Sequence, residues 1–227
     1  MPDTPRAGTR AFFSWSGGKD SMLALHRALE AGWRVDALLA MFDETGERSR
    51  SHAIVPALMR AQARSLGIPL VMRHAGWSDY EAVFVDQLRA FAAAGCTHGL
   101  FGDIDLQPHR DWEERVCARA GLIAELPLWQ APRRALVDEL FALGYRARVV
   151  CVDARVLDIS FCGREFDAGF VADLPAGVDA CGENGEFHTF VFDGPRLARP
   201  VHHELAAVHE VRSAAPAPGH HFVAELR

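Results

Sequence analysis

The sequence of 227 residues has almost no lysine, no paired cysteines and no excess of positive charge. Its five cysteines are odd in number and contain no CxxC pair: Cys96, Cys117, Cys151, Cys162 and Cys181. This spacing disfavours a disulfide framework or a zinc site and predicts reduced, buried thiols. The formal charge of −6 disfavours a surface that tracks phosphates, so we expect no nucleic-acid partner.

Long apolar segments are missing as well. No run approaches the roughly 18 residues that would suggest a membrane span, and no apolar stretch of a signal peptide follows the first residues. We therefore expect a cytoplasmic protein without a membrane partner. Hydrophobic residues make up 49% and charged residues 24% of the chain, which is typical of a globular protein with a sizeable core.

The shortage of lysine is extreme, because 23 of the 24 basic residues are arginine and the exception is Lys19. A coding bias toward arginine explains the exchange wherever either side chain will serve. A compact ammonium is needed where a wide guanidinium does not fit, as around a single phosphate oxygen. The imbalance therefore indicates Lys19 as a candidate phosphate ligand.

Strands and helices alternate over the first 150 residues. Strands are predicted at 10–15, 35–42, 68–73, 98–102, 122–126 and 146–152, and helices at 22–31, 56–66, 80–94, 110–120 and 133–143, the third ending at Gly95 and the last at Gly144. This alternation predicts an α/β fold, a doubly wound, Rossmann-like parallel sheet with helices on both faces. Beyond Val152 the rhythm breaks into short segments, which predicts a smaller α+β domain at 153–227 after a first domain at 1–152. Residues 214–219 are predicted to form a loop.

The first predicted strand runs into Ser16-Gly17-Gly18-Lys19-Asp20-Ser21, and a helix follows. In an open parallel sheet, ligands bind beyond the carboxyl ends of the strands, and the first turn usually lies there. Serine hydroxyls, two glycines and the N–H groups that open the helix together predict a phosphate cradle. The segment matches neither GxGxxG nor GxxxxGK[ST], which disfavours dinucleotide and Walker-type sites. An ordinary glycine turn with Asp20 as helix N-cap is the alternative.

This segment resembles the pyrophosphatase loop (PP-loop) of the ATP-pyrophosphatase superfamily, the adenine nucleotide alpha hydrolase-like proteins that split ATP into AMP and pyrophosphate. Within that superfamily the chain resembles the diphthine–ammonia ligase family along most of its length. The resemblance is carried by residues 14–21 (SWSGGKDS), 102–104 (GDI), 127–129 (PLW) and 182–187 (GENGEF). It implies an AMP-forming ligase that adenylates a carboxylate for attack by ammonia, with ATP bound in the first domain and the acceptor in the second.

The resemblance also implies the site residues. The ATP-binding residues would be Ser14, Trp15, Ser16, Gly17, Gly18, Lys19, Asp20, Ser21, Met41, Gly102 and Asp103. Asp103 is predicted to end the fourth strand, and in a sheet ordered 3-2-1-4-5 it would face the turn after strand one. A Mg²⁺ ion that bridges phosphate oxygens takes one or two carboxylates, for which Asp20 and Asp103 are candidates. A capping role is the alternative for Asp103.

The segment Glu183-Asn184-Gly185-Glu186-Phe187-His188 concentrates two acids and one base. These groups could deprotonate ammonium or orient the acceptor, and the resemblance implies that Glu183 and Glu186 belong to the acceptor side. The predicted catalytic residues are Lys19, Asp20, Glu183, Glu186 and His188. A hairpin turn at Asn184-Gly185 is the structural alternative.

Two departures concern the acceptor. Eukaryotic and archaeal ligases of this kind typically carry two glycines between the glutamates and a Glu-Thr pair afterwards, whereas this chain has Asn184 and then His188-Thr189. This pattern resembles a bacterial-type branch of the family. Diphthine, a modified histidine of elongation factor 2, is an archaeal and eukaryotic feature. We therefore expect another carboxylate acceptor, either a small molecule or a protein side chain.

Other functions remain open at this point. Sulfur transfer to a tRNA base uses the same loop elsewhere in the superfamily, and a regulatory module could hold ATP or AMP without turnover. Ammonia is the expected nitrogen donor, because the sequence contains no glutaminase module and Met1-Pro2 offers no amino-terminal cysteine nucleophile. A homodimer is left open.

Several histidines stand near the predicted site or in pairs. His52 and His109 are predicted in loops before helices, from which they could reach the site; solvated or capping roles are the alternative. The pairs 202–203 and 220–221 lack neighbouring Cys or carboxylate ligands, so a metal site there is disfavoured.

Overall fold

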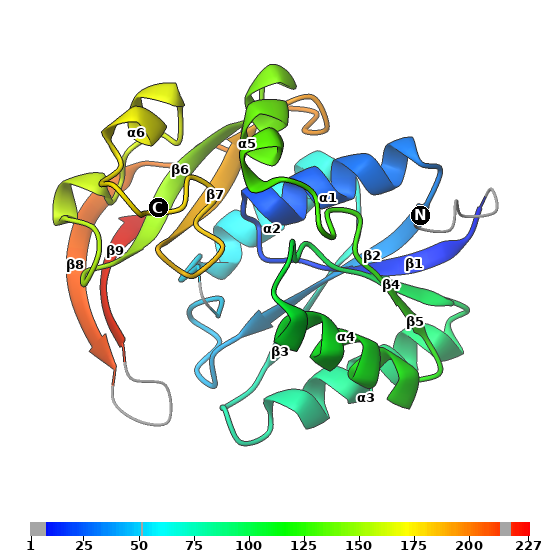
Figure 1. Ribbon diagram of the computed structural model, residues 1–227. Coiled ribbons are helices and arrows are strands. Elements are labelled where there is room, and N and C mark those ends of the chain that lie inside the picture. The colour runs from blue at the N-terminus through cyan, green and yellow to red at the C-terminus, as the bar shows by residue number, and fades with distance from the viewer. Residues whose placement is uncertain (1–7, 51, 214–218) are drawn as a thin grey trace. The chain divides into compact units, whose positions relative to one another are not determined.

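The computed structural model describes residues 8–50, 52–213 and 219–227 (Figure 1). The chain divides into two compact units that are each discontinuous in sequence. Unit 1 contains the chain up to Ser16, Asp20–Glu47 and Gly67–Ala131, and unit 2 contains Gly17–Lys19, Arg48–Leu66 and Pro132–Arg227. The domain boundary predicted at residues 152 and 153 falls inside unit 2, and a division at that point remains a prediction. Most of the loop predicted at 214–219 lies outside the described residues.

Unit 1 is built on a five-stranded parallel sheet in the order β3-β2-β1-β4-β5, which confirms the predicted α/β fold and strand order. Its elements are β1 (Arg10–Ser14), α1 (Lys19–Glu30), β2 (Arg34–Phe42), β3 (Leu70–His74), α3 (Tyr80–Ala93), β4 (His98–Leu100), α4 (Gln107–Arg119) and β5 (Ile123–Glu125). β1 lies between β2 and β4, so β2 and β3 are added on one side of β1, and β4 and β5 on the other. The loop that follows β1 therefore lies at the switch point of the sheet.

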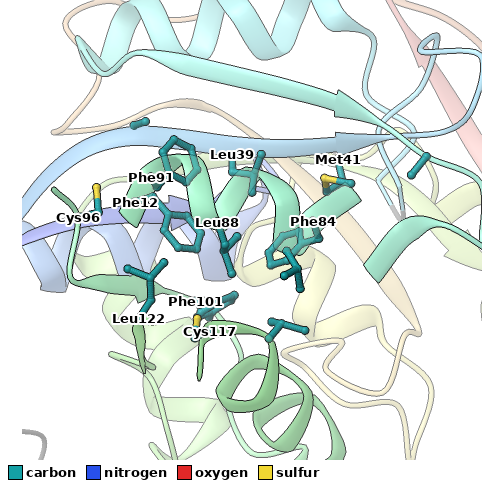
Figure 2. Close-up of a cluster of buried hydrophobic side chains, with 14 of the residues drawn as sticks. Phe12, Leu39, Met41, Phe84, Leu88, Phe91, Cys96, Phe101, Cys117 and Leu122 are labelled. Atoms are coloured by element: carbon teal, nitrogen blue, oxygen red, sulfur yellow. The ribbon is translucent and has the colours of Figure 1, made fainter. Parts of the chain in front are cut away.

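The core of unit 1 lies between the sheet and α3 and α4 (Figure 2). Phe84 and Leu88 recur on one face of α3 and are almost completely buried. Phe12 of β1 stacks on Phe91 of α3 with ring centroids 5.0 Å apart. Cys117 of α4 belongs to the same cluster, and all five cysteines are buried free thiols, as predicted. The opposite face carries α1 (Figure 1), so the sheet is covered on both sides.

Unit 2 is built on a four-stranded antiparallel sheet in the order β7-β6-β9-β8. Its elements are α2 (Pro56–Leu66), α5 (Arg133–Ala142), β6 (Arg146–Asp153), the short 3-10 helix η1 (Ile159–Phe161), α6 (Ala168–Asp173), β7 (Phe187–Asp193), β8 (Leu205–Ser213) and β9 (Gly219–Leu226). The prediction that residues 146–152 belong to the parallel sheet was wrong, because β6 pairs antiparallel with β7 and β9. The run VVCV is typical of a buried strand in either kind of sheet, and periodicity does not reveal its partners.

None of the helices in the described ranges is long and apolar enough to cross a membrane. The helix ends predicted from glycine are also found. Gly95 follows α3 and Gly144 follows α5, both with positive φ, which a glycine adopts without steric cost.

Candidate functional site

The loop between β1 and α1 carries the predicted phosphate-binding residues. Ser14 ends β1, and the buried Trp15 donates its backbone N–H to the Leu39 carbonyl of β2 at 2.8 Å. The Ser16 and Ser21 hydroxyl oxygens are 2.6 Å apart, and the Ser16 N–H also donates to the Ser21 oxygen. The two hydroxyls predicted to bind phosphate are thus held close together across the turn.

Gly102 lies just beyond β4 and packs against the start of α1. A Cβ added at Gly102 would stand only 3.0 Å from the Ser21 nitrogen and 3.1 Å from its Cα. A side chain at this position would push the backbone at the start of α1 aside, so glycine suits this close approach. The neighbouring order of β1 and β4 therefore brings Gly102 to the loop, as the sequence predicted.

Asp103 follows Gly102 and is bound by His109, whose Nδ1 lies 2.7 Å from Asp103 Oδ1. The prediction of a loop position for His109 was wrong, because His109 belongs to the first turn of α4. Burial alone would raise the pKa of Asp103, but hydrogen bonds with His109 and Glu113 outweigh this effect and lower the pKa. Asp103 is therefore ionised at neutral pH, which is the state in which a carboxylate binds Mg²⁺.

Asp20 lies in the first turn of α1, where the helix dipole favours a carboxylate. In the described part of the chain, no group of three or more His, Cys, Asp or Glu side chains is arranged to hold a metal ion. A Mg²⁺ ion at Asp20 or Asp103 would thus need phosphate oxygens among its ligands.

Met41 lies near the end of β2, and its side chain packs in the core cluster of unit 1 (Figure 2). It is 7% exposed. Burial of the side chain leaves the backbone at this strand end as the part that can line an adenine pocket.

Lys19 is the first residue of α1 and belongs to unit 2. Its side chain is buried, and its Nζ lies 5.3 Å from the ring centroid of Phe187 and 6.0 Å from that of Phe166. The Lys19 backbone N–H donates to the hydroxyl of the buried Thr189 at 3.0 Å. This bond joins the loop to β7, the strand that directly follows the acidic segment.

Gln62 of α2 also holds the loop after β1 in place, by hydrogen bonds to Gly17 and to β7. Its side-chain amide donates to the carbonyls of Gly17 at 2.9 Å and Val191 at 2.7 Å, and Gln62 is fully buried. The Val191 N–H also donates to the Gly17 carbonyl at 3.0 Å. Sequence analysis missed Gln62 and Thr189, since neither residue type nor spacing marks contacts between segments that are 45 to 170 residues apart.

Two histidines meet beside the loop. His52 lies between β2 and α2, and His188 is the second residue of β7; their ring centroids are 4.7 Å apart and their planes are tilted by 45°. A Cβ added at Gly18 would come within 2.6 Å of His52 Nε2 and 3.1 Å of the Thr189 carbonyl oxygen. Glycine at position 18 therefore makes room for His52 and for β7.

Both imidazoles are neutral at pH 7. Burial is the main cause that lowers the pKa of His52 well below its usual value, and repulsion from His188 and Lys19 lowers it further. A hydrogen bond with the Arg50 backbone offsets this lowering only in part. Burial, Lys19 and His221 lower the pKa of His188 to about 4. The pair thus presents two uncharged rings beside a buried ammonium group.

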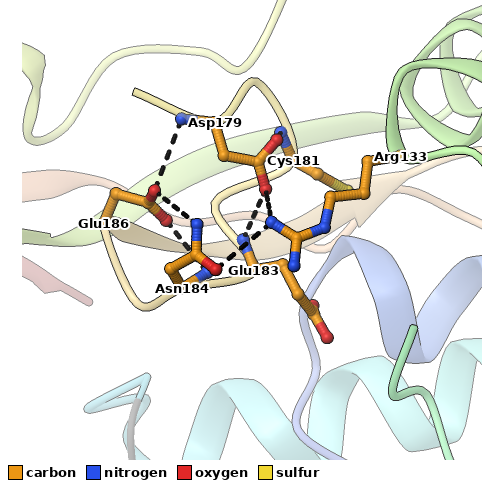
Figure 3. Close-up of polar contacts among 6 residues, drawn as sticks. All are labelled: Arg133, Asp179, Cys181, Glu183, Asn184 and Glu186. Atoms are coloured by element: carbon orange, nitrogen blue, oxygen red, sulfur yellow. Dashed lines mark hydrogen bonds and ion pairs between the residues drawn. The ribbon is translucent and has the colours of Figure 1, made fainter. Parts of the chain in front are cut away.

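The acidic segment forms a network closed by its own polar groups (Figure 3). The Glu186 carboxylate accepts hydrogen bonds from the backbone N–H and the side-chain amide of Asn184, both at 3.0 Å, and from the Asp179 N–H at 3.4 Å. Arg133 of α5 donates to Asp179 Oδ2 at 2.7 Å and to Asn184 Oδ1 at 3.3 Å. Asn184, which replaces a glycine of the typical pattern, therefore links Arg133 to Glu186.

The two glutamates differ in setting. Asp179 accepts the backbone N–H groups of Cys181 at 3.0 Å and Glu183 at 3.2 Å, which fixes the turn. The Glu186 carboxylate is buried within the network, whereas the Glu183 carboxyl points away from Glu186 and Asn184 (Figure 3). Glu183 is thus the acid that the turn presents outward.

The structural alternative, a tight polar turn at Asn184-Gly185, is found in part: residues 183–186 form a turn that leads into β7, but the turn does not join two paired strands of a hairpin. The strand that pairs with β7 is β6, whose last residue is Asp153 and not a residue just before the turn. Arg133 and Asp179 were also missed. An isolated arginine at the start of a helix gives no sign in the sequence of a partner 46 residues away.

Comparison with known proteins matches the chain in two consecutive ranges. The family models of the diphthamide synthase N-terminal domain and C-terminal domain match residues 9–124 and 132–210. A diphthine–ammonia ligase of Schizosaccharomyces pombe is 26% identical over 82% of this chain and 34% of its own length. Diphthine–ammonia ligases of Bos taurus and Homo sapiens are each 31% identical over 39% of this chain and 35% of their own length. The chain thus spans about a third of the length of these relatives.

The N-terminal match covers the parallel sheet and the loop after β1, and the C-terminal match covers α5, the acidic turn and β7. Together these matches include most of the described chain and every residue of the candidate site. The chain therefore belongs to the diphthamide synthase family.

Proposed function

We propose that this chain is an ATP-dependent amide ligase that forms AMP and pyrophosphate, with ammonia as the nitrogen donor. The observation that carries the proposal is the hydrogen bond from Lys19 to Thr189, which joins the phosphate loop to the strand that follows the acidic turn. A carboxylate held at the turn would lie near the end of the loop where phosphate groups bind. The names of the relatives support the same reaction class.

The reaction runs in two steps. A carboxylate oxygen of the acceptor attacks the α-phosphorus of ATP, and the bond to the bridging oxygen breaks, so that pyrophosphate leaves and an acyl adenylate forms. Ammonia then attacks the acyl carbon, the carbon–oxygen bond to AMP breaks, and an amide and AMP are released with one proton. Adenylation is needed because a free carboxylate is a poor acyl donor.

The residues of the loop bind and orient the phosphates in this proposal. Lys19 supplies a point charge at a buried position, where its attraction to an anion is screened little by water. The Ser16 and Ser21 hydroxyls exchange their mutual contact for phosphate oxygens. Asp20 and Asp103 are the candidates to hold Mg²⁺, which would neutralise part of the phosphate charge.

The acidic turn serves the acceptor. Glu183 is the proposed acid that contacts the acceptor or ammonia, because its carboxyl points out of the network, and Glu186 fixes the turn from which it projects. The acceptor is a carboxylate other than diphthine in this proposal, on a small molecule or a protein side chain. The cytoplasmic location and a homodimer remain predictions.

The thiols do not favour sulfur transfer. Burial raises the pKa of Cys117, Cys151 and Cys162 to about 12 in each case. A thiol that carries sulfur must be accessible and largely ionised. The five buried cysteines therefore support amide formation over thiolation.

The test uses the purified chain with ATP, Mg²⁺, ¹⁵N-labelled ammonium chloride and a cell extract fractionated into metabolites and proteins. We expect AMP and pyrophosphate in equal amounts, and ¹⁵N in an amide product, from one fraction only. Glu183→Gln should abolish the fraction-dependent AMP release, whereas Glu114→Gln, on the exposed side of α4, should not. AMP release without ¹⁵N incorporation would contradict the ligase, and nucleotide binding without any AMP would favour a regulatory module.

A further inference from the structure

Residues 127–129 (PLW) carry part of the resemblance to the family, yet they lie outside both the loop after β1 and the acidic turn. Together with Gln130 they form a turn directly after β5, here called the β5 turn (residues 127–130). The Trp129 N–H donates to the Leu126 carbonyl at 3.0 Å, and the Leu128 side chain is fully buried. Because the last residues of β4 and β5 lie opposite each other in the parallel pair, the β5 turn stands beside the loop that follows β4.

The last residue of this turn, Gln130, has a backbone conformation that residues with a Cβ rarely adopt, with φ at 57°. Among the described residues, positive φ occurs elsewhere only at glycines and at Ala53. The left-handed conformation is unfavourable for glutamine, because its Cβ comes close to the following carbonyl oxygen. Such strain persists where surrounding contacts determine the backbone. One such contact is short: the Gln130 N–H donates to the Ile104 carbonyl at 2.7 Å.

The hydrogen bond from Gln130 holds the loop that carries Asp103. Ile104, which accepts this bond, is the next residue after Asp103, and its side chain is fully buried. Gly102, the residue before Asp103, packs against the backbone at the start of α1. The Asp103 carboxylate itself is 2.7 Å from His109 Nδ1. Asp103 is therefore fixed by contacts of both its neighbours in the chain and of its own side chain.

The β5 turn also contacts the helix that holds the Asp103 carboxylate. The guanidinium carbon of Arg110 lies 4.9 Å from the ring centroid of Trp129, a distance typical of a cation–π interaction. Arg110 directly follows the histidine of α4 that binds Asp103. On the other side of the turn, Arg27 of α1 donates to the Pro127 carbonyl at 3.2 Å. The turn is thus joined to α1, to α4 and to the loop after β4.

We propose that the β5 turn positions Asp103 for the nucleotide: the left-handed backbone of Gln130 holds the Ile104 carbonyl, and Trp129 holds the start of α4. Gln130 is a positioning residue that acts through its backbone N–H and not through its side chain. This inference rests on the proposed function, in which Asp103 binds the nucleotide and is a candidate Mg²⁺ ligand. Its physical reason is that a displacement of about 1 Å in a binding group can cost on the order of 100-fold in rate.

Three variants separate the backbone from the side chain and the position from general strain. Gln130→Gly keeps the N–H and adopts positive φ without steric cost, so the bond to Ile104 should remain. Gln130→Val introduces a β-branched residue, which is an outlier at positive φ, so the backbone should change and the bond should break. Gly121→Val is the matched control, because Gly121 also has positive φ, has open space around it and lies at the other end of β5.

The experiment measures binding of the Mg²⁺ complex of α,β-methylene-ATP, which cannot be split at the α-phosphorus, by calorimetry at several Mg²⁺ concentrations. Hydrogen exchange, followed by NMR without nucleotide, measures the protection of the amide of residue 130. Urea denaturation of the same four proteins measures their stability. The first measurement reports on the nucleotide site, the second on the bond to Ile104 and the third on strain.

We expect Gln130→Val and Gly121→Val to lower the urea midpoint by similar amounts, because both place valine at positive φ. Gln130→Val alone should lose protection of the amide and bind the nucleotide about tenfold more weakly, a loss equivalent to about 1.4 kcal/mol. Gln130→Gly should keep the protected amide and bind the nucleotide as the wild type does.

Each other outcome overturns the inference. Nucleotide affinity of Gln130→Val equal to that of the wild type, or to that of a weakened Gly121→Val, would show that the turn has only a structural role. Equal weakening in Gln130→Gly and Gln130→Val would assign the effect to the side chain. If Gln130→Val does not fold, Trp129→Leu decides in its place, and unchanged nucleotide affinity of that variant rejects the proposal. If the folded wild type binds no nucleotide, the proposed function fails, and this inference fails with it.

Discussion

Two regions of unit 2 adjoin β7 and differ in how their polar groups interact with their neighbours. In the acidic turn, residues 179–186, the carboxylates of Asp179 and Glu186 accept hydrogen bonds from the backbone of the turn, from Asn184 and from Arg133. The lysine–histidine cluster, defined as Lys19, His52 and His188, holds one cation and two neutral rings whose pKa values are lowered. Asp179 and Glu186 of the turn are thus held by hydrogen-bond donors, whereas the two imidazoles of the cluster are held neutral beside a cation.

This difference concerns how rigid each region is and how strongly it responds to charge. A network whose donors and acceptors match is rigid, because any movement would leave a buried polar group without its partner. In the cluster, the pKa values of the two imidazoles depend on the charge next to them, so they would change if that charge changed. The turn is thus a fixed part of the fold, whereas the protonation state of the cluster depends on the charges around it.

The largest effect is expected at Lys19. Lys19→Arg should fold but lose ATP turnover on the order of 100-fold, the effect of removing one well-placed electrostatic group. The guanidinium is too broad for a position that is 4% exposed and bounded by Phe187 and Phe166. Steady-state AMP release is the measurement, and Arg60→Lys on the exposed side of α2 is the control. Turnover equal to wild type in Lys19→Arg would remove the lysine from the phosphate site.

The next effect is at Gly18. Gly18→Ala should lower the free energy of unfolding by about 1–3 kcal/mol, the usual cost of an overpacked interior. The new Cβ would meet His52 Nε2 at 2.6 Å and the Thr189 carbonyl at 3.1 Å, and the carbonyl belongs to the backbone of β7. Urea denaturation measures the free energy of unfolding of the variant and of the wild type. Gly76→Ala is the matched control, because its nearest obstacle is the end of the Asp79 side chain, and equal losses in the two variants would contradict the argument.

Substitutions of Glu186 and Glu183, the two glutamates of the turn, should have smaller effects and can be compared with each other. Glu186→Gln should cost about 1–2 kcal/mol of stability. One carboxylate oxygen would be replaced by an NH2 group, which would then face an N–H donor of Asn184 and could not accept its hydrogen bond. Glu183→Gln should cost less stability than Glu186→Gln, because the Glu183 carboxyl points away from the Glu186 network, yet reduce acceptor-dependent AMP release. Thermal and chemical denaturation are recorded beside the kinetics. A reversed order of stabilities would show that Glu183, and not Glu186, holds the turn.

The most gradual effect is the dependence of stability on pH. The folded protein lowers the pKa of His188 from its ordinary value of 6.5 to about 4, so between these values the unfolded chain binds more protons. Stability should therefore fall as the pH is lowered from 6.5 toward 4, with one proton worth at most about 1.4 kcal/mol per pH unit.

The substitution His188→Asn removes this group and should flatten the slope, measured by urea denaturation from pH 7 to pH 4.5. His202→Asn should keep the wild-type slope. An unchanged slope in His188→Asn would mean that the imidazole titrates normally in the folded state.

Much of unit 1 was predictable from its sequence. The apolar spacing of Phe84, Leu88 and Phe91 gave α3, and the glycines after helices gave the ends. The segment Ser16 to Ser21 was recognisable because a strand, a glycine turn and a helix follow one another locally. Parallel crossovers have one hand and short connections, so local patterns in an α/β sheet largely determine its topology.

The acidic turn was only half predictable. Glu183 and Glu186 could be named from the sequence, but their different settings could not, because Arg133 and Asp179 are distant partners in the chain. In the same way His52 was one lone histidine among eleven until its contact with His188 was known. Burial and neighbouring charge, which set the pKa values of both rings, are properties of packing and have no local sequence pattern.

The sequence by itself determined the phosphate loop, the position of the single lysine and the order of the parallel strands, since each depends on residues that are neighbours in the chain. Tertiary structure decided that β6 leaves the parallel sheet, that Gln62 and Thr189 hold the loop, and that two histidines meet beside Lys19. These outcomes depend on hydrogen bonds and burial between segments far apart in sequence. Such contacts form only when the whole unit folds, because the free energy of each comes from the desolvated surroundings that the other segments supply.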